Sequence, residues 1–534
     1  MTNQCEYEFS WSRKKEQQFG QYGDIKYNQL GEEKEISGSI DDIQLQEHQC
    51  PREAETDSNR CVWHTQRSGK STKDIKSASS NKQKLVCEPH LEDCTLNGSD
   101  LTEFSFLWAN FDDAELSNVN LSNMILFYSS FENAELDQVD FSGSDLSGSR
   151  FVDATFDNST FTKEKTDFQD SVCKGTNFID ADFKDSANFK SADFDRSSKL
   201  CRDLIDANFC NADLSETEFA DLVLTGADLR GANMSNATIN ADFTNANLTN
   251  VFAFDANLSG STLERAVLDG ANLQSTELVD TKLHSAVISD AIIDHDTNFD
   301  SISKYEKESV SRDDKDAKVE QINRAIWTYN SLSNLSKDNA LSKQAQEYYI
   351  KEKDLKRRLS WIQLCGPVST DSDGFSGLMT RKAGYIANLL TPEKDSDTDF
   401  HLRFGSQIKK VSTCIKSELS RLTINYGEGH RNVLASLGFT TLIYSFIYPI
   451  WGINQGGDMI KYSSPIDAIL SCSVEFDLEL WFTSLYFSIV TFTTLGYGDI
   501  QPEGFSRYVA ASEAVIGASL MALLVFVLGR RATW

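Results

Sequence analysis

The stretch from Leu204 to Ile239 reads LIDANFCNADLSETEFADLVLTGADLRGANMSNATI, and it decides the fold. Every fifth residue in it, beginning with Leu204, is a large apolar side chain. The same spacing covers 15 consecutive positions from Leu91 to Phe161, and each of them is Leu or Phe. An α-helix repeats about every 3.6 residues and a β-strand about every 2, so neither explains a period of five. The sequence therefore contains a long internal repeat of another kind.

The repeat extends on both sides of this stretch. Its register slips between Thr166 and Leu200, slips by one residue before Phe243, and then continues to Ile293. Ala often stands two positions before the large residue with Asp or Asn between them, as in Ala227-Asp228-Leu229. Over residues 86–300 this pattern resembles the A(D/N)LXX motif of the pentapeptide-repeat family.

That resemblance implies a right-handed, four-sided β-solenoid with one repeat on each side and four repeats in each coil. The large residue and the Ala would both point into a narrow interior. Roughly 210 residues would make about ten coils, which at a spacing of about 4.8 Å form a rod of about 50 Å.

The charge of the chain is concentrated in this repeat. The formal charge of the 534 residues is −29, and residues 91–300 hold 39 acidic and 12 basic residues. Such a surface repels phosphate, so we expect no nucleic-acid partner. Two interpretations stay open. The acidic rod could mimic duplex DNA in front of a DNA enzyme, as in some members of the family, or it could be a solvated scaffold. The sequence does not identify its cytoplasmic partner.

Two apolar segments near the carboxyl end predict membrane spans. Asn432–Trp451 and Val509–Leu528 are 20 residues each, which as helices cross a bilayer core of about 30 Å. The mean hydropathy of the chain, −0.38, excludes a protein that lies in the membrane throughout. Basic residues flank the outer ends of the pair, and acidic residues dominate between them. The positive-inside rule then predicts a multi-pass cell-membrane protein with both termini in the cytoplasm.

Between the spans, Leu480–Thr493 is apolar but too short to cross, which indicates a re-entrant pore helix containing Trp481 and Thr493. It is followed by Thr494, Leu495, Gly496, Tyr497, Gly498 and Asp499. This hexapeptide resembles the TVGYGD selectivity filter of the potassium-channel family, with Leu495 in place of Val. The resemblance implies that backbone carbonyls replace the water around a permeant K⁺ ion and that four chains close the ring, as a homotetramer in the lipid bilayer. A Gly-rich turn between two strands is the alternative.

Two residues of the second span add to this site. The resemblance implies a gating hinge at Gly517, although a small residue there could instead allow close helix packing. Glu513 is an acid inside the membrane, where acids face a pore or a polar partner. We expect it either to brace the pore helix or to raise the K⁺ concentration in the cavity.

The other segments carry weaker signals. Residues 1–85 are polar and predicted to be largely disordered. Within them Cys5, Cys50, Cys61 and His64 could hold a structural zinc ion as a Cys/His knuckle, or remain unliganded. Residues 301–404 predict a helical hairpin connector and a linker. Residues 405–431 predict a basic amphipathic helix, lying on the membrane or forming an ordinary domain helix.

The expected fold is therefore multidomain: the N-terminal segment, the β-solenoid of 86–300, the helical connector, the basic helix, and a two-transmembrane α-helical pore domain over 432–534. We predict a potassium-selective ion channel whose cytoplasmic solenoid regulates or scaffolds it. The alternatives are a non-selective cation channel and a membrane-anchored interaction protein that mimics DNA. The sequence shows no nucleophile–base motif, P-loop or HExxH, so we do not expect an enzyme.

Overall fold

The structure, a computed structural model, describes residues 8–9, 48–49, 70–74, 85–87, 89–102, 104–161, 166–183, 187–300, 303–311, 314–365, 400–427, 429–461 and 478–532. The predicted zinc ligands Cys5, Cys50, Cys61 and His64 lie outside the described residues. Near the N-terminus β1 (Glu8–Phe9) pairs with β2 (His48–Gln49) in an antiparallel arrangement. The chain divides into two compact units, Met1–Lys307 with Asn334–Leu341, and Glu308–Ser333 with Ser342–Trp534.

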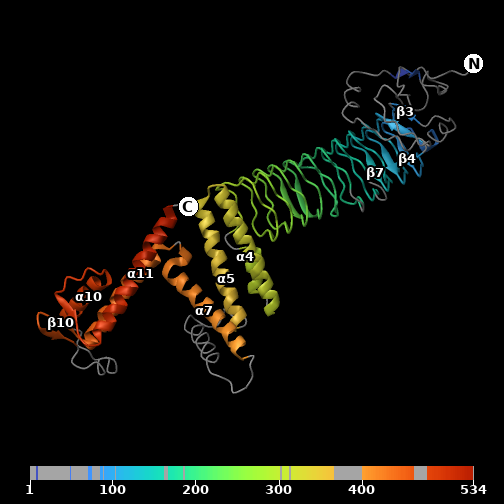
Figure 1. Cartoon of the computed structure of the whole chain (residues 1–534). Helices are drawn as coiled ribbons and strands as arrows, with labels where there is room; N and C mark the ends of the chain where they lie inside the picture. The colour runs from blue at the N-terminus through green and yellow to red at the C-terminus, as the bar shows by residue number, and fades with distance from the viewer. Residues whose placement is uncertain are drawn as a thin grey trace, which may run out of the picture. The chain divides into compact units, whose positions relative to one another are not determined.

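The first unit contains the repeat, which folds into a stack of coils joined by parallel β-bridges (Figure 1). Thr95 pairs with Glu115 and Glu115 with Glu135, so each of these coils takes four repeats. Some bridges extend into short strands: β3 (Leu85–Cys87), β4 (Thr95–Asn97), β5 (Ser105–Leu107), β6 (Glu115–Ser117), β7 (Glu135–Asp137), β8 (Glu218–Val223) and β9 (Thr238–Asp242). They form the parallel sheets β3-β5, β4-β6-β7 and β8-β9.

The interior of the stack consists of the residues that the period selects. The 15 large positions from Leu91 to Phe161 are all buried. The alanines two positions earlier, such as Ala114 and Ala134, are also fully buried. Rings in successive coils stack on each other, as Phe111 on Phe131 with centroids 4.7 Å apart. Each coil is therefore stabilised mainly by its two neighbours.

The register slips are changes in coil length. Asp145 pairs with Asp167 and Asp167 pairs with Asn188, so both of these coils are longer than the regular ones. Asp228 pairs with Asn247, and that coil is shorter than the regular ones. The ladder of bridges that contains Asp145, Asp167 and Asn188 continues to Asp228 and Asn247, so it passes through both changes.

Polar contacts close the carboxyl end of the solenoid. Helix α3 (Lys304–Val310) begins just after the last coil, and the hydroxyl of its buried Tyr305 donates to Glu264 at 2.9 Å. The side chain of Asn339 accepts from the backbone N–H of Ile293 at 3.1 Å and donates to the carbonyl of Ala291 at 2.9 Å. These bonds satisfy backbone groups that would otherwise be left open at the end of a β stack.

In the second unit, α4 (Lys315–Asp338) and α5 (Ser342–Cys365) pack side by side. The rings of Tyr329 and Tyr348 stack at 6.1 Å, and the Ser333 hydroxyl donates to the carbonyl of Ala345 at 2.9 Å. The basic helix is α7 (Phe400–Ile424), which ends at the 3₁₀ turn η2 (Asn425–Gly427).

The carboxyl-terminal part places a short helix and a small sheet between two long helices. The long helices are α8 (His430–Trp451) and α11 (Ser506–Ala532), with α10 (Leu478–Phe492) between them. Strands β10 (Ile453–Gln455), β11 (Asp458–Ile460) and β12 (Ile500–Pro502) form an antiparallel sheet in the order β11-β10-β12. Among the described residues two helices are long and apolar enough to cross a membrane, His430–Trp451 and Ser506–Gly529, by length and composition.

Candidate functional site

The sign of the backbone φ angle alternates along the hexapeptide Thr494–Asp499. The φ angles of Thr494, Gly496 and Gly498 are +55°, +51° and +78°, whereas Leu495 and Tyr497 between them are not in the positive region. Glycine adopts such angles without a steric penalty, but they are rare for a β-branched residue such as Thr494. An alternating sign of φ is one condition for successive peptide carbonyls to turn toward the same side, and Thr494–Gly498 meets this condition.

Hydrogen bonds hold this segment at both ends. At its start, the N–H of Leu495 donates to the carbonyl of Val490 in the last turn of α10 at 3.1 Å. At its end, Asp499 leads directly into β12, where Ile500 pairs with Gln455 of β10. The middle is open in the single chain, since Leu495 is 60% exposed and Tyr497 68% exposed. A segment fixed at its ends and exposed between them is suited to lining a pathway shared with other copies.

Tyr486 of α10 lies close to the end of this segment, beside Ile500 of β12. The sequence did not single out Tyr486. Trp481, which it did select, lies in α10 and packs on Phe446 of α8 with ring centroids 5.8 Å apart. The sequence feature that could have identified Tyr486 is its position two helical turns before Thr494. From there a pore-helix side chain can reach the far end of the hexapeptide. Thr493 lies at the end of α10, and its hydroxyl donates to the carbonyl of Ile489 at 2.7 Å.

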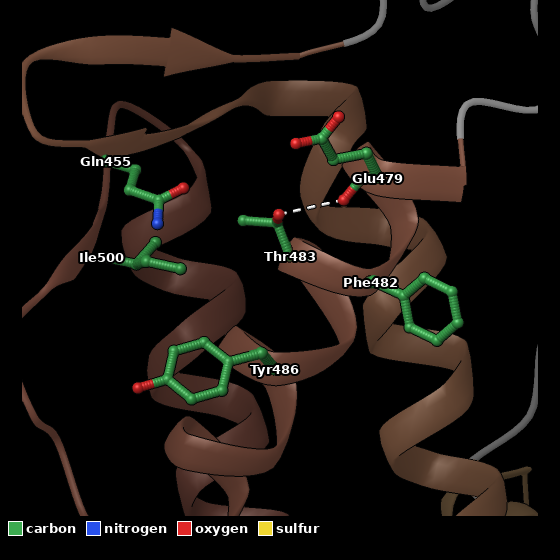
Figure 2. Close-up of a pocket in the computed structure, with 6 residues that line it drawn as sticks. All are labelled: Gln455, Glu479, Phe482, Thr483, Tyr486 and Ile500. Atoms are coloured by element: carbon green, nitrogen blue, oxygen red, sulfur yellow. Dashed lines mark hydrogen bonds between the residues drawn. The ribbon is translucent and has the colours of Figure 1, made fainter.

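Tyr486 also lines an open cavity of about 530 Å³ beside the end of the hexapeptide. Figure 2 shows its six lining side chains, which come from β10, α10 and β12: Gln455, Glu479, Phe482, Thr483, Tyr486 and Ile500. The hydroxyl of Thr483 bonds to the backbone carbonyl of Glu479 at 2.9 Å and so turns back into its own helix.

Glu513 of α11 is fully buried where three helices meet. Its carboxylate accepts hydrogen bonds from the hydroxyl of Tyr448 on α8 and the hydroxyl of Ser488 on α10. Both of these partners are also fully buried. A cavity acid would be open to solvent in a single chain, so these contacts favour a brace for the pore helix over a cavity charge. An acid inside a span indicates a pore or a polar partner, but the sequence did not identify Tyr448 or Ser488 as the partners of Glu513.

Gly517, one turn after Glu513, packs against the end of the pore helix. A Cβ at this position would lie 2.3 Å from the carbonyl oxygen of Phe492. The backbones of α10 and α11 can come this close only because Gly517 has no side chain. This contact supports the interpretation that Gly517 allows close helix packing. Its role as a hinge stays a prediction.

A polar junction joins the connector to the basic helix. Arg357 of α5 donates to Asp354 of its own helix and to Glu418 of α7, at 2.8 Å each. Burial acts to lower the pKa of the Arg357 guanidinium, but the hydrogen bond and charges of these acids raise that pKa above its ordinary value. The hydroxyl of Tyr426 contacts Asp354 at 3.4 Å, and Tyr426 has a φ of +58°. The junction thus includes the turn at which α7 ends and α8 begins.

Ile415, Leu419 and Leu422 of α7 are each more than 50% exposed. They form an apolar stripe at positions i, i+4 and i+7, and Lys409, Lys410 and Lys416 are also exposed. A helix with this pattern next to a span fits a membrane surface.

No group of three or more potential metal ligands occurs among the described residues. The free thiols are Cys94, Cys173, Cys201, Cys210 and Cys414. Burial raises the pKa of the Cys94, Cys173 and Cys201 thiols to about 12, so they remain protonated and unreactive.

Comparison with known families matches both halves of the chain. Residues 459–533 match the family described as ion channel. Residues 90–126, 125–162, 203–240 and 254–290 match pentapeptide repeats, in 8 copies. Protein LctB of Bacillus caldotenax is 33% identical over 122 residues, which are 22% of this chain and 86% of that protein.

Solved structures are similar over the repeat. The pentapeptide repeat protein HetL from the cyanobacterium Nostoc sp. strain PCC 7120 is 24% identical with a TM-score of 0.22, covering 43% of this chain and 94% of HetL. QnrB1, a plasmid-mediated fluoroquinolone resistance protein, is 15% identical with a TM-score of 0.18, covering 40% of this chain and 93% of QnrB1.

Proposed function

The chain is a pentapeptide-repeat protein fused to a two-transmembrane member of the ion-channel family, and on that premise we propose that it forms a potassium-selective channel. Four copies close a pore around Thr494–Asp499, whose carbonyls replace the water around K⁺. The observation that carries the proposal is the alternation of φ at Thr494, Gly496 and Gly498. A Gly-rich turn between two strands does not require positive φ at every second residue.

The proposed membrane arrangement follows from the ends of the two helices. Trp451 at the end of α8 and Phe505 just before α11 pack at 5.0 Å, and Tyr508 beside them is 73% exposed. Aromatic residues favour both membrane interfaces, so these three mark the ends of the two spans at one face of the bilayer. His430 and Arg431 then lie on the cytoplasmic side with Arg530 and Arg531, which puts both termini in the cytoplasm.

The solenoid, which we propose to be right-handed and four-sided, then lies in the cytoplasm and acts as a regulator or scaffold. Its influence on the pore runs through the α5–α7 junction, because η2 connects α7 directly to α8. The apolar stripe of α7 rests on the lipid surface while its lysines meet lipid phosphates.

Ion flux in liposomes that contain the purified full-length protein tests this function. We expect uptake of K⁺ and rubidium but little of Na⁺, and a particle mass four times the chain mass of 59.8 kDa. Equal uptake of K⁺ and Na⁺ would establish a non-selective channel instead. Absence of any flux from an intact assembly would favour the membrane-anchored interaction protein.

A matched pair of glycine variants separates the filter from general backbone strain. Gly496 has a φ of +51° and Gly456, in the β10–β11 turn, has a φ of +63°. A Cβ at either position would meet no atom within 4 Å, so both Ala substitutions impose conformational strain alone. We expect Gly496→Ala to abolish selective K⁺ flux and Gly456→Ala to retain it. Equal flux through both variants would contradict the assignment of the filter.

A further inference from the structure

We propose that Glu513 is a positioning residue for selectivity, which joins the outer, pore and inner helices of one subunit and fixes the pore helix beneath the filter. The inference rests on the proposed channel function. It adds that selectivity depends on a buried hydrogen-bond cluster outside the filter, made of Glu513, Tyr448 and Ser488, which we name the three-helix clasp.

Each member of the three-helix clasp comes from a different helix. Tyr448 of α8 and Ser488 of α10 donate to different oxygens of the Glu513 carboxylate, so both oxygens are used. Ser488 also contacts the carbonyl of Thr441 on α8 at 2.9 Å. All three clasp side chains are fully excluded from solvent, which makes the loss of any one contact costly, because a buried polar atom is then left without a partner.

The clasp acts together with the Gly517 contact. Ser488 and Phe492 are four residues apart on α10, and Glu513 and Gly517 are four residues apart on α11. The inner helix therefore holds the last turn of the pore helix at two successive levels, by hydrogen bond and by backbone contact. Thr493 and Thr494 follow Phe492 immediately, so a shift of that last turn displaces the first carbonyls of the filter.

A neighbouring pair provides an internal control. The hydroxyl of Tyr444 on α8 contacts the hydroxyl of Ser512 on α11 at 2.9 Å, at an exposed position. Tyr444 is one turn from Tyr448, and Ser512 adjoins Glu513. This bond links α8 to α11, as the clasp does, but it does not include the pore helix. Its loss should leave the filter in place.

The experiment records K⁺ and Na⁺ permeability of the full-length channel in planar bilayers, from reversal potentials under opposed KCl and NaCl. We expect Ser488→Ala, Glu513→Gln and Tyr448→Phe to form tetramers but to lower the K⁺/Na⁺ permeability ratio by about tenfold or more, the effect of one unsatisfied buried group. Glu513→Gln keeps the side-chain volume but replaces one acceptor oxygen by an NH₂ group. Tyr444→Phe and Ser512→Ala should change the ratio less than about twofold, as expected for an exposed bond.

Assembled clasp variants with the ratio of the wild type would overturn the proposal while leaving the channel function intact. A double variant Ser488→Ala/Glu513→Gln would also overturn the proposal if its change in the permeability ratio equalled the product of the two single changes. Partners in one contact are not independent, so their changes should not multiply. Should Glu513→Gln fail to assemble, Ser488→Ala and Tyr448→Phe decide the outcome. A wild-type protein that passes neither ion would overturn both proposals.

Discussion

At Gly517 the spacing of two helices depends on the absence of a single side chain. A Cβ there would lie 2.3 Å from the carbonyl oxygen of Phe492, so Gly517→Ala must push α11 away from α10. We expect a loss of roughly 1–3 kcal/mol in the free energy of unfolding, as for other overpacked cores. Thermal unfolding of the detergent-solubilised assembly measures it.

Gly438 of α8 is the matched control, because a Cβ there would meet no atom within 4 Å. Gly438→Ala should gain up to about 1 kcal/mol from helix propensity. A Gly517→Ala protein that melts at the same temperature as Gly438→Ala would show that the contact imposes no constraint.

Asp145 in the solenoid predicts a pH dependence. The pKa of the Asp145 carboxyl is raised to about 6. Burial is the largest cause and the charge of Asp167 in the next coil adds to it, while the hydrogen bonds from Ser147 act in the opposite direction. An unfolded Asp has a pKa of about 3.9, so the folded state binds more protons between pH values of roughly 4 and 6. Stability contributed by Asp145 is therefore full below a pH of about 4 and is lost as the pH rises through about 6.

Replacing the acid by its amide should remove this dependence. We expect Asp145→Asn to be more stable than the wild type at neutral pH, by on the order of 1 kcal/mol, and equal to it at a pH of about 4. Melting of the β signal in circular dichroism at both pH values tests this. An identical difference at the two values would rule out the titration of Asp145 as its cause.

At the scale of elements, the α5–α7 junction depends on one part-buried cation, Arg357, whose side chain is 13% exposed. Arg357→Gln removes the cation that Asp354 and Glu418 share, so we expect the contact of α7 with α5 to weaken by roughly 1–3 kcal/mol. Hydrogen exchange of the α7 backbone amides measures this as a loss of protection.

Arg358 is the control, since it pairs with the same Asp354 at 2.8 Å but its side chain is 50% exposed. Its exposed ion pair should contribute less than about 1 kcal/mol. If Arg358→Gln and Arg357→Gln lose the same protection, the loss comes from the change in net charge and not from the specific contact of Arg357 with Glu418 of α7.

The elements that the sequence predicted well are those whose signal is local. The period of five marked the buried columns of the solenoid, and apolar length marked α8, α10 and α11 to within a few residues. The sheet β10-β12 was not predicted, because strands of three residues show no periodicity. The Arg357–Glu418 pair was also missed, since its partners are far apart in the sequence and only the packing of α5 on α7 brings them together.

The candidate site divides in the same way. Thr494–Asp499 was selected by its resemblance to the potassium-channel filter, and its glycines favour the positive φ angles found at Gly496 and Gly498. Tyr486 and the hydroxyl partners of Glu513 depend on which faces of three helices meet, and a single sequence records such contacts only as isolated polar residues in apolar helices. For the same reason the sequence singled out Trp481 in the pore helix but not Tyr486, which lines the cavity beside the hexapeptide.

At the scale of the whole molecule, the solenoid should influence the pore without forming part of it. We expect a chain lacking residues 1–300 to conduct K⁺ with the selectivity of the full protein, because the filter and its hydrogen bonds lie within residues 441–517. Its open probability should differ, since the solenoid no longer acts on α5 and α7. Single-channel recording measures both quantities, and an unchanged open probability would limit the solenoid to a scaffold.

The uneven coils also bear on how such a protein can evolve. Longer and shorter coils occur along one solenoid, and the ladder of bridges through Asp167, Asn188, Asp228 and Asn247 passes through both kinds. Because each coil contacts mainly its neighbours, a solenoid of this kind can take up a change in the length of one coil more readily than a globular domain with one shared core. A lineage can lose, duplicate or recombine whole turns of this scaffold by unequal crossing-over, while the conducting module keeps its own sequence under separate selection.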